Sequence, residues 1–405
     1  MPPRHTNSCR TATSDITKSA YDWYAFGPEI KGCGLELGLF LMPAAQAERP
    51  LAETIAWNLE MIGRADTLGY SEAWIGQHIT SPWEPLVSPQ QIIAGALGQT
   101  ERIRLGTGVE VLYQQHPVRL AAELAQLDHM AKGRLMFGFG AGGTLTDGQL
   151  YGLDLRSGES QKMSQEALRI ILDCWKEGGP DDFDGEYWTV RRPANYSENY
   201  YWHLTPFAPA EPRIGFAGFM PNSGSLKTAG EHGYIPLSFN VAPEHVAVHW
   251  SSVEEGAAIS GRTPSRANWR HIREIYVADT KAEARQAVVD GFMGRFWNRY
   301  FSVIAQRLGI EDMFRRAGAP GDAPVDAGYL VDHGTWFVGD PDQVVEQIVE
   351  QYEVTGGFGV LLQIGFDYSD AGARGGWLRS MDLLAREVMP RVRARLGPAA
   401  VRAVS

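Results

Sequence analysis

The sequence has few cysteines, no long apolar run and no basic cluster, and each absence argues against a class of protein. Its three cysteines, Cys9, Cys33 and Cys174, are widely spaced and odd in number, which fits neither a disulfide framework nor a zinc-type cluster. No apolar stretch approaches the length that spans a bilayer, and the N-terminus lacks the apolar core of a signal peptide. We therefore expect a cytoplasmic protein without a membrane partner.

The charge balance and the missing motifs narrow the function further. The formal net charge is −11 and no run of lysine and arginine stands out, so we expect no nucleic-acid partner. No His-x-Glu or Glu-x-x-His pair has metal-ligand spacing, and no Gly-x-Ser-x-Gly elbow or Walker loop occurs. We therefore expect no metal site.

What the chain does contain is a regular alternation of short apolar runs and helix-like stretches. Leu51–Leu68 has apolar residues close to helical spacing and ends at Gly69, and Ser88 caps a second helix that begins at Pro89. Further helices are expected over 117–130, 159–176, 223–231, 341–354 and 378–389, and a hairpin over 183–190. Strands are expected over 35–41, 73–75, 104–109, 134–140, 213–218, 235–238, 272–277 and 359–364. About eight β–α pairs in strict alternation predict an α/β protein, a (β/α)8 TIM barrel rather than an open sheet.

No linker divides the chain, so we expect one barrel domain over residues 33–395. Insertions are expected near 180–212 and 280–335, the second of them helical and rich in loops. Residues 1–32 are polar and irregular, which predicts an arm that is partly disordered or packs on a partner subunit. Residues 396–405 are expected to form a C-terminal tail.

His78 is the first candidate for catalysis. The stretch Ser71–His78 is predicted to be a strand that follows a helix and carries a histidine to its C-terminal end. In a βα-barrel those strand ends form the active-site rim, so a polar side chain there is a catalytic candidate. The alternative is a histidine that only makes hydrogen bonds within a loop.

Two glycine-containing segments are candidates for holding a cofactor. Gly138–Gly143 formally matches a dinucleotide fingerprint, but residues 144–148 resemble a turn where that motif needs a helix. Gly140 and Gly142 instead suggest a strand end against which a flat ring can lie. Asn222–Ser225 precedes a helix and can hold a phosphate, and the alternative is ordinary capping by Ser223.

Three further residues have both a functional and a structural interpretation. Arg119, at the start of a helix after the third strand, is either an anion ligand or a surface charge. Glu110 is either solvated or points into the mouth of the barrel. His203, next to Tyr200, Tyr201 and Trp202, either lines an apolar pocket or belongs to an aromatic core.

Many short motifs, in order and spacing, resemble those of the bacterial-luciferase-like flavin monooxygenases, and in particular the limonene 1,2-monooxygenase-like group. The similarity extends from about Leu35 to Val392. The matching segments are Trp74–Ile79 with Trp83–Glu84, 105–108, His116–Pro117, 126–130, 132–134, 137–138, 202–206, 216–218, 223–225, 338–341, 355–359 and 385–390.

The resemblance implies a TIM barrel that binds reduced FMN at the C-terminal rim. A separate NAD(P)H-dependent FMN reductase supplies this FMNH2, and O2 adds to carbon 4a of the ring to give a hydroperoxide that oxygenates an apolar organic substrate. The reaction is a Baeyer–Villiger insertion, a hydroxylation or an epoxidation, and a homodimer is expected by analogy. His78 matches the family histidine that acts near the flavin peroxide. The cofactor contacts are expected at Thr107, Gly108, Gly140, Gly142, Ser223, Gly224, Ser225 and Arg119, and the substrate pocket at Trp83, Glu110, Tyr113 and His203.

The chain also departs from the family pattern. Gln77 and Ile79 replace a glutamate and a second histidine, and Gly365–Tyr368 differs from the Gly-His-Asp-Trp of relatives. We therefore expect a diverged substrate pocket and a substrate other than limonene. Two alternatives stay open: a deazaflavin-dependent oxidoreductase that transfers hydride, and a flavin-binding protein without catalytic activity.

Overall fold

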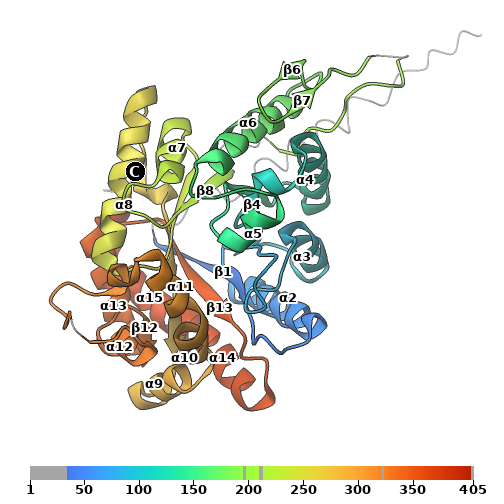
Figure 1. The fold of residues 1–405 in the computed structure, drawn as a ribbon. Helices are drawn as coiled ribbons and strands as arrows, with labels where there is room; N and C mark the ends of the chain where they lie inside the picture. The colour runs from blue at the N-terminus through green and yellow to red at the C-terminus, as the bar shows by residue number, and fades with distance from the viewer. Residues whose placement is uncertain (1–33, 195–197, 209–212, 322, 403–405) are drawn as a thin grey trace, which may run out of the picture.

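Eight parallel strands close into a barrel, which confirms the TIM-barrel prediction (Figure 1). The structure is a computed structural model, and it describes residues 34–194, 198–208, 213–321 and 323–402. The expected arm over 1–32 lies outside the described residues. Pairing of β3 with β5 and of β1 with β13 completes the ring. The barrel strands are β1 (Glu36–Ala44), β2 (Glu72–Ile75), β3 (Arg104–Thr107), β5 (Leu135–Gly140), β8 (Ile214–Gly218), β9 (Ile235–Ser238), β10 (Arg270–Arg273) and β13 (Val360–Phe366).

Helices surround the barrel, as expected for strands that are buried on both sides. The predicted helix at Leu51–Leu68 is confirmed as α2, and Gly69 ends it with a φ of 80°. The other outer helices are α3 (Pro89–Ala96), α4 (Pro117–Ala131), α6 (Glu159–Cys174), α7 (Gly224–His232), α8 (Pro243–Ser260), α13 (Pro341–Thr355) and α14 (Ala371–Leu383). The predictions did not include α8. Among the described residues, none of these helices combines the length and apolar character needed to cross a bilayer.

The C-terminal segment continues as helix further than expected. After α14 come a π-helical turn, η7 (Leu384–Val388), and α15 (Met389–Arg402). Gly397 interrupts α15 with a φ of 67°, so the expected tail over 396–405 begins inside this helix. The predicted hairpin over 183–190 is confirmed as β6 (Phe183–Asp184) paired with β7 (Thr189–Val190).

Trp74 fills the interior of the barrel. Its indole is fully buried and faces glycines on three other strands, Gly106, Gly138 and Gly215. A Cβ atom at these glycines would lie 2.6, 3.0 and 2.9 Å from atoms of the indole. The glycines are therefore needed because a large ring replaces the side chains that normally fill a barrel interior.

One layer closer to the N-terminal ends of the strands, a buried carboxylate joins three strands. Glu72 accepts two hydrogen bonds from Arg270, at 3.0 and 3.1 Å, and one each from Arg104 at 3.1 Å and the Trp74 indole at 2.8 Å. Burial alone raises the pKa of such a carboxyl, but Arg270 and Arg104 outweigh it, so the pKa of Glu72 is lowered. Glu72 is therefore a charged, fully paired group inside the protein.

The segment 280–335 covers the C-terminal end of the barrel. It follows β10 and β11 (Ile275–Val277), and contains α9 (Lys281–Val289), α10 (Phe292–Phe296), the π-helix η5 (Trp297–Phe301), α11 (Ser302–Leu308), η6 (Glu311–Phe314) and α12 (Ala327–Asp332). The strand β12 (Phe337–Gly339), which pairs with β11, follows it. We call the part from Phe292 to Leu308 the cap, because Figure 1 shows α10 and α11 in front of the barrel strands.

Candidate functional site

The C-terminal ends of β2 and β5 bring His78 together with residues far along the chain. A hydrogen bond of 2.8 Å joins its Nδ1 to the hydroxyl of Thr144. Two carboxylates flank the ring, Glu84 at 3.7 Å from Nε2 and Asp147 at 3.8 Å from Nδ1. The side chain is 24% exposed, so the imidazole is oriented by neighbours yet accessible from the rim.

Asp147 holds the loop that carries His78. Its buried carboxylate accepts hydrogen bonds from the backbone amides of Ile79, at 3.1 Å, and Thr80, at 2.8 Å. It lies in a short helix, α5 (Leu145–Leu150), where the sequence had suggested only a turn. That expectation was wrong, because the glycines before Thr144 hide the start of the helix.

Trp83 and Glu84 connect the same loop to the cap. The Trp83 ring stacks on Tyr300 with centroids 5.9 Å apart and on Phe292 at 6.3 Å. The Tyr300 hydroxyl donates to Glu84 at 2.5 Å and accepts a hydrogen bond of 2.9 Å from Ser81. Burial and the neighbouring Glu84 raise the pKa of Tyr300, so the phenol keeps its proton and remains a donor.

Replacing Tyr300 with phenylalanine is expected to loosen the contact between the cap and the His78 loop. The variant removes a hydrogen bond to a charged group, which lowers the free energy of unfolding by about 1.5–3 kcal/mol. The measurements are the denaturation midpoint and hydrogen exchange of the amides in the loop, which should become faster. Tyr329→Phe is the control, because that hydroxyl donates a long hydrogen bond of 3.5 Å to the backbone carbonyl of Pro320, away from the His78 loop. Equal midpoints for the two variants would contradict the proposed link.

Thr107 and Gly108 lie in the wall beside this loop. The hydroxyl of Thr107 is fully buried, donates to the carbonyl of Gly138 at 2.8 Å and accepts from its amide at 3.0 Å. A Cβ at Gly108 would lie 2.9 Å from Trp74. Both residues therefore have clear packing roles in the barrel wall.

The two glycines after β5 also accommodate protein side chains. A Cβ at Gly140 would lie 2.6 Å from Val109. Gly142 has a φ of 74°, and a Cβ there would lie 3.0 Å from the ring of Tyr113. Both glycines lie at the rim, where the sequence predicted them. Their close contacts with Val109 and Tyr113 are themselves a reason for glycine at these positions.

Ser223 caps α7, as the structural interpretation expected. Its hydroxyl accepts a hydrogen bond of 3.3 Å from the amide of Leu226. Because α7 follows β8, its N-terminus with Gly224 and Ser225 lies at the same end of the barrel as His78. Capping and anion binding use different amides of a helix N-terminus, so one does not preclude the other.

Glu110 and Tyr113 pack against the helices and loops around the barrel. Glu110, in β4 (Glu110–Val111), is 1% exposed and accepts hydrogen bonds from Gln90 of α3 at 3.3 Å and Gln115 at 2.7 Å. Burial raises the pKa of this carboxyl to about 7. Tyr113 packs in a small separate cluster with Val111 and Leu155. These side chains contact the surrounding helices and loops, and the assignment of both residues to the substrate pocket stays a prediction.

Arg119 and His203 are also not part of this group. Arg119 is 74% exposed on α4 and pairs with Glu123 at 2.6 Å. His203 belongs to the segment between α6 and β8, which lies at the N-terminal end of the barrel because α6 has returned the chain there. The neighbouring Trp202 donates to the carbonyl of Cys174, the last residue of α6, at 2.8 Å. His203 is therefore at the opposite end from His78.

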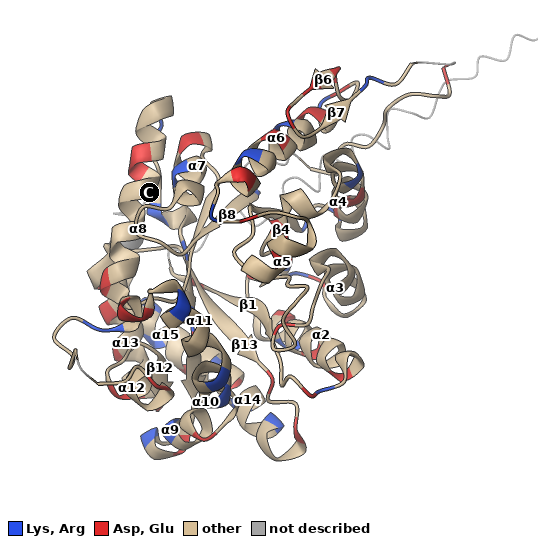
Figure 2. Ribbon diagram, viewed as in Figure 1, with Lys and Arg blue, Asp and Glu red and all other residues tan. Residues whose placement is uncertain are grey.

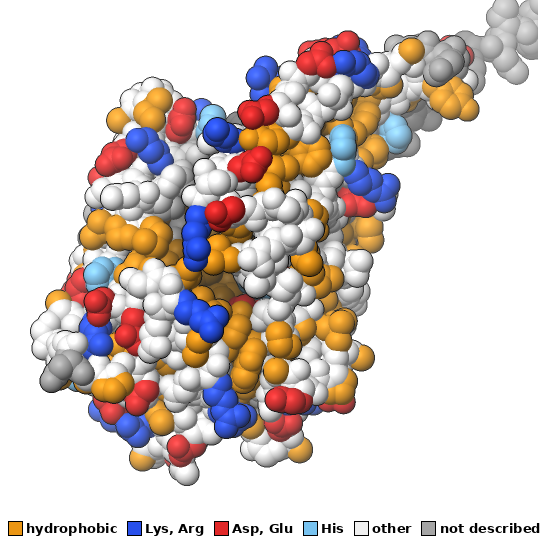
Figure 3. Space-filling view, viewed as in Figure 1, with side chains coloured by type: hydrophobic (Ala, Val, Ile, Leu, Met, Phe, Trp, Pro, Cys, Tyr) orange, Lys and Arg blue, Asp and Glu red, His pale blue; other side chains and the backbone are white. Residues whose placement is uncertain are grey.

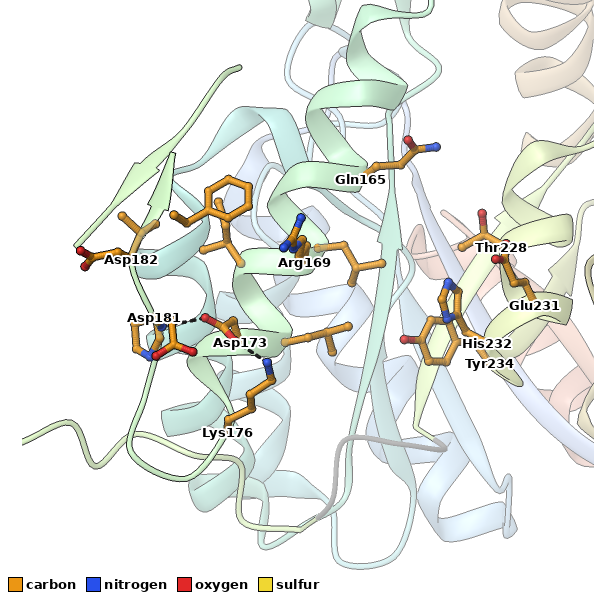
Figure 4. Close-up of a pocket in the computed structure, with 16 residues that line it drawn as sticks. Gln165, Arg169, Asp173, Lys176, Asp181, Asp182, Thr228, Glu231, His232 and Tyr234 are labelled. Carbon is orange, nitrogen blue, oxygen red and sulfur yellow. Dashed lines mark hydrogen bonds and ion pairs between the residues drawn. The ribbon is translucent and has the colours of Figure 1, made fainter. Parts of the chain in front are cut away.

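A groove of about 730 Å³ lies between α6 and α7, on the outer face of the barrel (Figure 4). Arg169 of α6 and Tyr234, just after α7, line it from two sides. None of the residues expected to bind cofactor or substrate lines this groove. It is therefore separate from the His78 site.

The face of the molecule that carries α5 and α11 is hollowed (Figure 3). Charged residues of both signs are interspersed over the outer helices (Figure 2). The face shown in Figure 3 is hollowed between α5 and α11, with hydrophobic side chains inside the hollow. The open end of the barrel is therefore an apolar depression next to the cap.

The sequence alone does not predict the roles of Thr144, Asp147 and Tyr300, which orient or surround His78. No local pattern marks them, because each contacts the His78 loop only through the tertiary fold. For Asp147 the sequence does contain one indication. It lies in the first turn of a helix that follows a strand end, where an acidic side chain is often found.

Comparison with known proteins gives a consistent family assignment. The family model described as luciferase-like monooxygenase matches residues 35–357. Over 375 residues the chain is 30% identical to 3,6-diketocamphane 1,6-monooxygenase of Pseudomonas putida, covering 88% of this chain and 98% of that protein. It is 31% identical over 369 residues to limonene 1,2-monooxygenase of Rhodococcus erythropolis, covering 90% and 88% of the two chains.

A solved structure supports the same assignment. The oxygenating constituent of 3,6-diketocamphane monooxygenase of Pseudomonas putida, a type II Baeyer–Villiger monooxygenase in complex with FMN, superposes with a TM-score of 0.82. The identity is 30%, and 88% of this chain and 98% of that chain are covered. The matched family model, the two full-length relatives and the shared barrel show that this chain belongs to the luciferase-like monooxygenase family.

Proposed function

We propose that this chain is the oxygenase of a two-component system that uses FMNH2 and O2 to oxygenate an apolar, cyclic organic substrate. The observation that carries the proposal is His78, which is oriented by Thr144 and two carboxylates at the rim of a barrel of this family. A similar protein is described as the oxygenating constituent and has FMN bound. This description also supports a separate NAD(P)H-dependent reductase as partner. A homodimer in the cytoplasm remains part of the proposal.

The residues at the rim fit FMN. The N-terminus of α7, with Ser223, Gly224 and Ser225, suits a phosphate group because backbone amides and a helix dipole attract anions there. Two buried oxygens, Gln77 Oε1 and Glu84 Oε1, have no hydrogen-bond partner among the described residues and leave acceptors at the rim. These features are expected where a ligand with polar edges binds.

Bound FMN, once reduced, supplies the electrons with which O2 is activated. The protein orients the reacting groups, excludes water from the site and provides a proton donor. Trp83, stacked under the cap, excludes water from the space next to His78. Because Nδ1 of His78 bonds to Thr144, Nε2 is the atom that can exchange a proton with a reacting group.

Stopped-flow measurement with reduced FMN and O2, repeated over a panel of cyclic ketones and terpenes, tests the proposal. We expect O2 consumption together with a product that gains one oxygen atom. FMN binding without any product would favour the non-catalytic alternative. Binding of a deazaflavin in place of FMN would favour the hydride-transfer alternative, for which F420-dependent structures at 20–21% identity give only the shared fold.

A further inference from the structure

A buried carboxylate lies between His78 and the cap. The side chain of Glu84 is only 4% exposed, and its Oε2 lies 3.7 Å from Nε2 of His78. The same oxygen accepts a hydrogen bond of 2.5 Å from the hydroxyl of Tyr300. The other oxygen, Oε1, has no hydrogen-bond partner among the described residues. One carboxylate oxygen is therefore approached by the imidazole from one side and by the cap from the other.

The proton of the Tyr300 hydroxyl points to Glu84. Ser81 donates to the oxygen of this hydroxyl at 2.9 Å, so the oxygen is the acceptor for Ser81 and its own proton goes to the carboxylate. Burial and the neighbouring carboxylate also raise the pKa of Tyr300, so the phenol stays protonated. Tyr300 therefore acts as a donor to Oε2.

The neighbours of the imidazole favour a proton on Nε2. On the Nδ1 side, Asp147 already accepts hydrogen bonds from the amides of Ile79 and Thr80 and from the Thr80 hydroxyl. The hydroxyl of Thr144 can donate to an unprotonated Nδ1, because a hydroxyl is both a donor and an acceptor. On the Nε2 side, Glu84 still has one oxygen without a partner. A proton on Nε2 therefore meets a carboxylate that has acceptor capacity left.

The imidazole and the phenol compete for the same oxygen. At 3.7 Å the Nε2 proton is attracted to Glu84 Oε2 but forms no hydrogen bond with it, since N–H···O bonds are about 2.7–3.2 Å long. The hydrogen bond from Tyr300 withdraws negative charge from Oε2 and thereby weakens this attraction. Without the phenol, a small rotation of the ring or of the carboxylate brings Nε2–H into direct contact with Glu84.

We propose that Glu84 is a positioning residue that holds the proton of His78 on Nε2, and that Tyr300 keeps this proton available to the reacting group by occupying Oε2. The contact between the cap and Glu84 then determines whether the imidazole proton is shared with the ligand or retained by the carboxylate. The inference deepens the proposed function and rests on it, because proton transfer by His78 is part of that proposal.

Proton and nitrogen NMR of the full chain, labelled with 15N at histidine and measured without flavin, tests the inference independently of turnover. We expect Nε2 of His78 to be protonated in the native chain, and His78→Phe identifies the signal by its loss. In Tyr300→Phe the Nε2 proton should move downfield, because it gains a hydrogen bond to Glu84. Adding Glu84→Gln to Tyr300→Phe should largely reverse this shift, since an uncharged amide oxygen is a weaker acceptor.

Two controls make the NMR experiment specific. Tyr329→Phe removes another phenol hydroxyl from the same insertion, whose hydrogen bond goes to Pro320, and should leave the His78 signals unchanged. His271 is fully buried with its Nδ1 2.9 Å from the side-chain nitrogen of Gln351, and its signals should be the same in every variant.

Product formed per molecule of reduced FMN consumed is the second measurement. We expect Tyr300→Phe to lower it by about tenfold, the equivalent of one hydrogen bond, and the double variant to recover part of the loss. An unprotonated Nε2 in the native chain, or an unchanged His78 signal in Tyr300→Phe, would overturn the inference and leave the proposed function in place if product is formed. The expected NMR changes in a chain that forms no product would instead overturn the proposed function.

Discussion

Replacing His78 with phenylalanine is expected to lower product formation by roughly 100-fold, the usual contribution of a positioned acid–base group, while FMN still binds. Phenylalanine keeps a ring in the same place but removes the nitrogen bonded to Thr144 and the nitrogen beside Glu84. The measurements are product formed per molecule of reduced FMN consumed and the dissociation constant of FMN. We expect electrons to be diverted to hydrogen peroxide, so O2 consumption should persist while coupling to product falls.

Two control variants make this experiment specific to the imidazole. His203→Ala removes a histidine at the opposite end of the barrel and should leave product formation unchanged. Thr144→Val removes the hydroxyl that orients the ring, so its effect should lie between the native chain and His78→Phe. Unchanged product formation in His78→Phe would exclude His78 from the mechanism.

Replacing Glu72 with alanine is expected to lower the free energy of unfolding by about 3–5 kcal/mol, because it leaves the buried cation of Arg270 without a counter-charge. Arg270, with 3% exposure, loses both of its hydrogen bonds to this carboxylate, and the Trp74 indole loses its acceptor. The measurement is the midpoint of chemical denaturation. Glu36→Gln is the control, because Glu36 contacts Arg104 only at 3.5 Å on a partly exposed face and should change stability by less than about 1 kcal/mol.

The same carboxylate makes the stability of the barrel sensitive to acid. The pKa of Glu72 is lower in the folded chain than its ordinary value of 4.5, so the unfolded chain takes up this proton at higher pH. Its contribution to stability is therefore complete above that ordinary value and is lost as the pH falls below it. Glu72→Ala should lose less stability on acidification than the native chain does. An equally steep loss in both would show that other carboxylates dominate the acid response.

The barrel was predictable because the information needed for it is local. In α2 the apolar residues recur at helical spacing and Gly69 ends the helix, so its bounds were found correctly. The missed helix α8 buries His249 and Ser252 along with apolar residues, and this mixture obscures the pattern that reveals an amphipathic helix.

The candidate site was only partly predictable, because its contacts join distant parts of the chain. The position of His78 after a strand followed from topology, but Thr144 lies 66 residues away, and Tyr300 lies 216 residues from Glu84. His203 was placed wrongly because an aromatic neighbourhood does not reveal which end of a barrel it occupies. Its position between a helix and the next strand does reveal this, since such segments lie at the N-terminal end.

The indole of Trp74 and the ion pair between Glu72 and Arg270 close the axis of the barrel from within. Among the described residues these buried side chains fill the axis between its two ends, so a small molecule reaches the depression beside the cap from the rim side and departs the same way. When two ligands enter a site through the same opening, the one that binds deeper must bind first and dissociate last. The order of binding and release is then dictated by depth in the depression, independently of which ligand has the higher affinity.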